Sequence, residues 1–113
     1  MIAKHEKLIV DLLQKTETGA AKWEPTDSES QVALKLKKGV ILLDKQRLVG
    51  ASGHAADYRL TILDSEGNVI ERIRPEGLYY REKTERLFDT AKRQIAKIDD
   101  KLAEIIGELD ELR

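Results

Sequence analysis

The C-terminal stretch Phe88–Leu112, FDTAKRQIAKIDDKLAEIIGELDEL, decides the architecture expected for this chain. Its apolar residues recur at alternating intervals of three and four, which is the heptad repeat of a helix that buries one stripe of side chains. The pattern predicts a single C-terminal helix over residues 78–112. The stripe consists of its a and d positions, which we interpret as an oligomer interface: Phe88, Ala91, Ile95, Ile98, Leu102, Ile105, Leu109 and Leu112.

The predicted helix is too long for the domain that carries it. From Arg81 to Leu112 it would measure about 48 Å at 1.5 Å per residue, whereas a compact domain of this size has a diameter of roughly 35 Å. One end should therefore overhang and expose side chains such as Leu102 and Ile105. Because burying each such side chain is worth ~1.5–3 kcal/mol, the overhang predicts a partner.

The charges of this helix suggest which partner. Residues 81–97 hold six basic and three acidic side chains, whereas residues 98–113 hold six acidic and two basic ones. A helix dipole prefers the opposite order, so the arrangement is unfavourable for a lone helix. An antiparallel second copy would place each basic half against an acidic half. The sequence thus predicts a homo-oligomer, with a dimer favoured over higher states.

A second interpretation keeps the stripe inside one chain. The helix could end near Asp99-Asp100, where either aspartate could cap a second helical piece. The shortened helix would then pack along the chain's own sheet and first helix. The sequence leaves both interpretations open.

The remainder of the chain predicts an α+β fold with one domain. Apolar residues at helical spacing indicate an N-terminal helix over residues 1–18. Between residues 20 and 75 the period changes to two, as in Val32, Leu34 and Leu36, which predicts strands. Short turn-like connections, including Asp64–Asn68, indicate an antiparallel β-meander of about four strands. The order is therefore helix, sheet and long C-terminal helix.

Composition excludes several classes of protein. The 113 residues contain no cysteine, which removes disulfides, thiolate metal sites and thiol nucleophiles. The net charge is -1, whereas a dedicated nucleic-acid binder usually carries a basic excess. No apolar run approaches the ~18–20 residues of a membrane helix, and Met1–Glu6 has no signal-peptide core. We expect a cytoplasmic protein without a membrane contact.

Candidate catalytic and metal-binding residues are few. His5 and His54 lack a second histidine at ligand spacing, so no metal or cofactor is expected. The Gly50–His54 segment resembles neither a complete P-loop nor a dinucleotide fingerprint. Asp64, Glu66 and Asn68 fit a hairpin turn better than a calcium loop, because the twelfth position is Pro75. The sequence therefore predicts a protein that is not an enzyme.

A basic stretch supports an alternative function. Basic strands beside an aromatic residue such as Trp23 or Tyr58 can bind single-stranded nucleic acid, which would make this a nucleic-acid-associated accessory protein. Lysines on a solvated sheet face can also simply prevent edge-to-edge pairing. The side chains concerned are Lys35, Lys37, Lys38, Lys45 and Arg47.

Two segments resemble the opening helix and a hairpin of small uncharacterised bacterial or phage-like α+β proteins. They are LLQKTETGAAKWE, from Leu12 to Glu24, and YRLTILDSEGNVI, from Tyr58 to Ile70. The resemblance implies an α+β fold and a bacterial or phage-like origin, and it implies no catalytic residue. The function expected from the sequence is thus that of a non-enzymatic protein that interacts with other proteins or assembles with itself.

Overall fold

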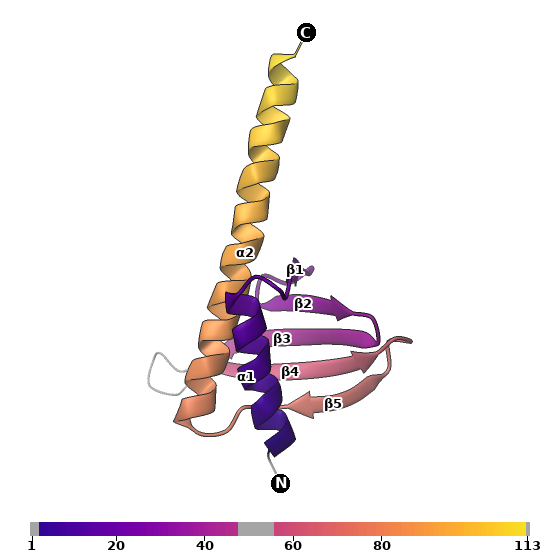
Figure 1. Ribbon diagram of the computed structural model, residues 1–113, viewed down its shortest axis with the longest axis vertical. Coiled ribbons are helices and arrows are strands. Elements are labelled where there is room, and N and C mark those ends of the chain that lie inside the picture. Colours follow the sequence, from indigo (N-terminus) through magenta and orange to yellow (C-terminus); the bar gives the residue numbers. More distant parts are fainter. Residues whose placement is uncertain (1–2, 48–55, 113) are drawn as a thin grey trace.

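The computed structural model describes residues 3–47 and 56–112, and its elements follow the predicted α+β order (Figure 1). In chain order, one helix precedes five strands and a long C-terminal helix follows them. The number of strands is one more than the approximate number expected. The elements are α1 (Ala3–Glu17), β1 (Glu24–Pro25), β2 (Gln31–Leu36), β3 (Gly39–Arg47), β4 (Ala56–Asp64), β5 (Val69–Ile73) and α2 (Leu78–Glu111).

The five strands form one antiparallel meander in the order β1-β2-β3-β4-β5. Lys37 and Lys38 form the turn between β2 and β3. The next residue must be glycine, because a Cβ on Gly39 would lie 2.1 Å from the carbonyl oxygen of Leu63 on β4. The close approach of two backbones therefore fixes the residue type that follows this turn.

The turn after β4 is a hairpin, as the sequence predicts. One carboxylate oxygen of Asp64, Oδ1, accepts hydrogen bonds from the backbone N–H groups of Glu66 and Asn68, each at 2.9 Å. These bonds lower the pKa of Asp64 below its ordinary value. Gly67 has a φ of 88°, a conformation that glycine adopts without steric cost. The carboxylate of Asp64 therefore stabilises the turn itself.

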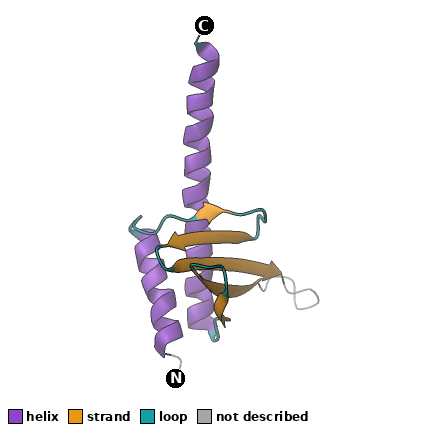
Figure 2. Ribbon diagram, turned by 90° about the vertical axis from the view of Figure 1, so that its right-hand side faces the viewer, coloured by secondary structure: helices purple, strands orange, loops and turns teal. Residues whose placement is uncertain are grey.

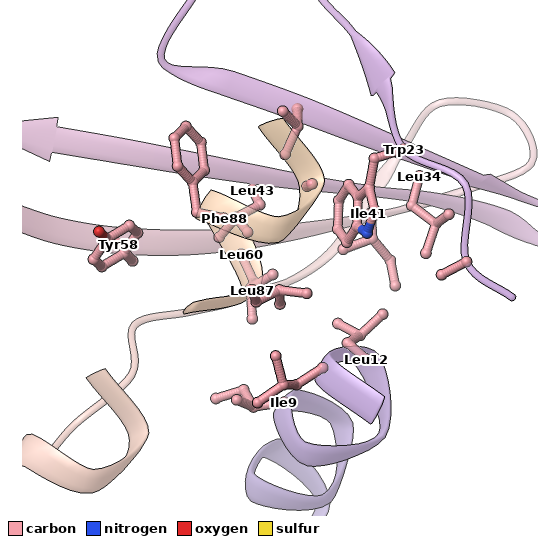
Figure 3. Close-up of a cluster of buried hydrophobic side chains, with 14 of the residues drawn as sticks. Ile9, Leu12, Trp23, Leu34, Ile41, Leu43, Tyr58, Leu60, Leu87 and Phe88 are labelled. Carbon is pink, nitrogen blue, oxygen red and sulfur yellow. The ribbon is translucent and has the colours of Figure 1, made fainter. Parts of the chain in front are cut away.

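The hydrophobic core lies between one face of the sheet and the two helices (Figure 3). Alternate residues of the strands point into it, as the period of two predicts. Trp23, just before β1, is only 1% exposed and is among the largest fully buried side chains. The core residues labelled in the close-up are Ile9, Leu12, Trp23, Leu34, Ile41, Leu43, Tyr58, Leu60, Leu87 and Phe88.

Helix α2 runs without interruption through Asp99 and Asp100. The alternative of a break at these aspartates is therefore wrong. About half of the helix extends beyond α1 and the sheet, which confirms the predicted overhang (Figure 2). The radius of gyration is 16.3 Å, compared with about 13 Å for a compact domain of this length.

A bilayer-spanning helix is not found among the described residues, since no described helix is both long enough and apolar enough.

Candidate interaction interface

The predicted apolar stripe of α2 divides into two parts with different surroundings. Phe88, Ala91 and Ile95 are 9% exposed or less and belong to the chain's own core. The prediction that these three residues form an oligomer interface is wrong, because α1 and the sheet already cover them. A heptad pattern specifies a buried stripe and does not specify whether the covering surface comes from the same chain.

The second part of the stripe is exposed. Its five members, and the adjacent Ile106 outside the a and d positions, are between 50% and 73% exposed, and no described element lies beside them. An exposed apolar stripe of this length is typical of an interaction site on a soluble domain. These six side chains, called the projecting stripe below, are Ile98, Leu102, Ile105, Ile106, Leu109 and Leu112.

A polar cluster holds α2 just before the helix leaves the domain. The side-chain amide of Gln94 donates hydrogen bonds to the carbonyl oxygens of Thr16 and Ala21, each at 3.1 Å, and accepts one from the backbone N–H of Trp23 at 3.2 Å. The indole N–H of Trp23 donates to the hydroxyl of Thr16 at 2.9 Å. These bonds tie α2 to the end of α1 and to the loop that follows it.

The sequence did not predict a structural role for Gln94, because a single glutamine on a helix resembles any solvent-exposed residue. Its role depends on three backbone groups that are brought to it by segments more than 70 residues away. Nothing in its local sequence marks these contacts. The cluster fixes the base of the projecting helix and therefore the direction in which that helix leaves the domain.

The charges at both ends of α2 are unfavourable for an isolated helix. The N-cap residue is Gly77, and no side chain donates or accepts a capping hydrogen bond there. The first turn has no acidic residue, and the last turn has no basic residue. Within the described part of the chain, the acidic residues of the projecting half form no ion pair. Among the residues that the structure describes, the acidic tip thus has no ion-pair partner.

Two basic residues in the first half of α2 make contacts that stabilise the domain. Arg86 forms an ion pair with Glu17 of α1. The ammonium group of Lys92 donates a hydrogen bond of 2.8 Å to the carbonyl oxygen of Glu29. Arg93 and Lys97, one and five residues closer to the tip than Lys92, are exposed. These two cations lie where the helix emerges from the domain.

The predicted basic surface on β2 and β3 is not one surface. Lys35 pairs with Glu24 at 3.3 Å, whereas Lys37 and Lys38 lie in the turn at one end of the sheet. Lys45 lies six residues along β3 from that turn, with its ammonium group 5.8 Å from the centre of the Phe88 ring. Lys35 and Lys45 occupy opposite faces of the sheet, because Lys45 pairs with core residue Tyr58.

The remaining parts of that prediction also differ from the structure. The side chain of Arg47 lies outside the described residues. Trp23 and Tyr58 are buried and cannot act as stacking platforms for bases. Burial, together with the charges of Glu85 and Asp89, raises the pKa of Tyr58 to about 12. Both aromatic side chains therefore belong to the core.

The other candidate residues that the structure describes do not assemble into a reactive centre. Nε2 of His5 lies 3.7 Å from a carboxylate oxygen of Glu71, beside a cleft of about 320 Å³ between α1, β5 and the start of α2. Burial and the neighbouring Glu6 raise the pKa of Tyr80 in this cleft. The Gly50–His54 segment lies outside the described residues. Among those described, no three metal-ligating side chains form a cluster.

Comparison of the chain with models of protein families, with characterised proteins and with solved structures finds no match.

Proposed function

We propose that this protein is a non-enzymatic assembly protein that self-associates through the projecting half of α2. The observation that carries the proposal is the projecting stripe, which continues the heptad of the domain core into open space. A side chain such as Ile105 gains ~1.5–3 kcal/mol when it is fully removed from water. A solvent-exposed row of six such side chains therefore favours a covering surface.

A second copy of the chain supplies a suitable surface. Five members of the projecting stripe have the a and d spacing that a partner with the same spacing matches by knobs-into-holes packing, and Ile106 flanks them at position e. The acidic residues of the tip form no ion pair within residues 3–47 and 56–112, whereas exposed Arg93 and Lys97 lie at the base of the same projection. Two copies in opposite directions bring each acidic tip toward a basic base. These features support an antiparallel homodimer.

The decisive measurement is the molar mass of the full chain over a dilution series through micromolar concentrations. The unmodified protein should show a mass twice that of the 12.8 kDa chain, decreasing toward that of the monomer on dilution. Ile105→Asp should shift dissociation to a concentration at least tenfold higher, because it places a charge in the apolar seam. Circular dichroism should remain that of a folded α+β domain, since Ile105 contacts no core residue.

Gly107→Asp provides a matched control. It adds the same charge two residues away, but on the outward face of the heptad, where a new Cβ meets no atom within 4 Å. Association of this variant should match that of the unmodified protein. A monomeric mass for the unmodified protein at all concentrations would show that the proposal is wrong.

A further inference from the structure

We infer that the two helices pair in one specific antiparallel register, in which Ile98 faces the partner's Leu109 and Leu102 faces the partner's Ile105. This inference rests on the proposed function, because it assumes that the second copy covers the projecting stripe. In an antiparallel pair each a position faces a d position of the other helix. Several registers one heptad apart satisfy that rule, and the structure distinguishes among them.

One alternative register overlaps the two helices by one more heptad, and the burial of side chains within the domain excludes it. A shift of one heptad in that direction would place Ile95 opposite the partner's Ile105 and Ala91 opposite the partner's Leu109. Ile95 is 9% exposed and Ala91 is fully buried beneath the chain's own elements. The partner helix cannot reach side chains that the sheet and α1 already cover.

A shift in the other direction brings like charges together. It would pair Leu102 with the partner's Leu112 and Ile105 with the partner's Leu109. Each Glu108, at position g, would then lie beside the partner's own Glu108. The inferred register covers Ile98 and also brings the partner's Leu112 level with Ile95, at the edge of the domain core. It is therefore the register that matches the boundary at which α2 leaves the domain (Figure 1).

The flanking charges independently select the same arrangement. Lys101 and Glu108 both occupy position g, one residue before an a position. In the inferred register the two-fold axis passes between Ala103 and Glu104, so each Lys101 lies beside the partner's Glu108. Two opposite-charge pairs result. A parallel pair in register would instead place Lys101 beside the partner's Ile106, because position g then faces position e.

The acidic tip of each helix also comes level with the base of the other helix in this register. The partner's Asp110 comes level with Lys97, which is exposed at the base of the projecting half. The segments of the two helices between residues 95 and 112 overlap for about 26 Å at 1.5 Å per residue. The two sheets then lie at opposite ends of a shared antiparallel helix pair.

Disulfide trapping tests the register directly, because the chain contains no cysteine of its own. Two single variants are prepared, Ile98→Cys and Leu109→Cys, and each is oxidised alone and as an equimolar mixture. Cysteines can be bridged only when their Cβ atoms approach within about 4.5 Å. In the inferred register, position 98 faces position 109 of the other chain and lies far from its own equivalent.

The mixture should therefore give a covalent dimer of unlike chains, approaching half of the total, while each variant alone gives little. Covalent dimers in the two single-variant samples would indicate parallel helices and overturn the inference. A dimeric mass under reducing conditions with no covalent dimer in any oxidised sample would overturn the register but leave the proposed function intact. A monomeric mass for the unmodified protein would instead contradict the proposed function.

Charge reversal gives a second test that does not depend on disulfide geometry. Lys101→Glu and Glu108→Lys should each weaken association severalfold, because each creates two like-charge pairs. The double variant carrying both changes restores opposite charges and should associate like the unmodified protein. Asp100→Lys is the matched control for Glu108→Lys, since it makes the same charge change at an outward heptad position. A double variant as weak as the single ones would contradict the inferred pairing of residues 101 and 108.

Discussion

Trp23 shows how one residue joins three parts of the molecule. Its ring fills the core between α1 and the sheet, while its indole N–H is satisfied by Thr16 and its backbone N–H by Gln94. A buried indole needs such a partner, because an unpaired N–H in the core is costly. Trp23 therefore stabilises the base from which α2 projects, although it lies far from the projecting stripe in sequence.

Trp23→Ala should lower the free energy of unfolding by about 3–5 kcal/mol, since it leaves a large cavity in the core. Urea unfolding followed by circular dichroism measures this change. Lys22→Ala, at the exposed neighbouring position, serves as the control and should change the same quantity by less than about 0.5 kcal/mol. An unchanged midpoint for Trp23→Ala would mean that the ring is not part of the core.

At the scale of the element, α2 is one helix with two roles. Its first half packs on α1 and the sheet, and its second half has no covering element among the described residues. The two halves share the same heptad, so their difference comes from the position of the domain and not from their own sequence. Intrinsic helix stability matters more in the second half, because fewer tertiary contacts support it.

Gly107→Ala tests this difference. Gly107 lies on the outward face of the projecting half, where an added Cβ meets nothing within 4 Å. Alanine should favour the helix by ~1 kcal/mol over glycine in that position. Amide hydrogen exchange in residues 104–111 should slow severalfold, whereas exchange in β3 should not change. Equal rates in the variant and the unmodified protein would argue against a helix supported mainly by its own propensity there.

The whole molecule is an elongated body made of a compact domain and a projecting helix, measuring 61 by 38 by 26 Å. Every buried hydrophobic residue among those described lies at or before Ile95. The domain core is therefore complete without the projecting half. This separation predicts that removal of the projecting half abolishes self-association and leaves the domain folded.

A chain truncated after Lys97 should fold and remain monomeric. Its unfolding midpoint, at concentrations where the full chain is also monomeric, should lie close to that of the full chain. Its molar mass should be that of one chain even at high micromolar concentration. A truncated chain that still dimerises would place the interface on the domain, and one that fails to fold would show that the tip contributes to the core.

Sequence alone determined the order of the elements and predicted a C-terminal helix, but it left open whether that helix breaks near Asp99-Asp100. Period-two alternation in residues such as Val32 and Leu34 requires a strand with one buried face, and the heptad of Phe88–Leu112 requires a helix with one buried stripe. These are local consequences of backbone geometry. For an unbroken helix the overhang also followed from the sequence, because it then depends only on helix rise and on the size of the domain.

Only the tertiary structure decided what covers each part of that stripe. Phe88 occupies an a position and Ile98 a d position of the same heptad stripe. Phe88 is buried by its own chain, whereas Ile98 is exposed. The distribution of Lys35 and Lys45 over opposite faces, and the contacts of Gln94, likewise depend on which distant segments meet. Burial is a property of the surfaces that come together in space, and a local sequence pattern specifies that a face needs cover without specifying its source.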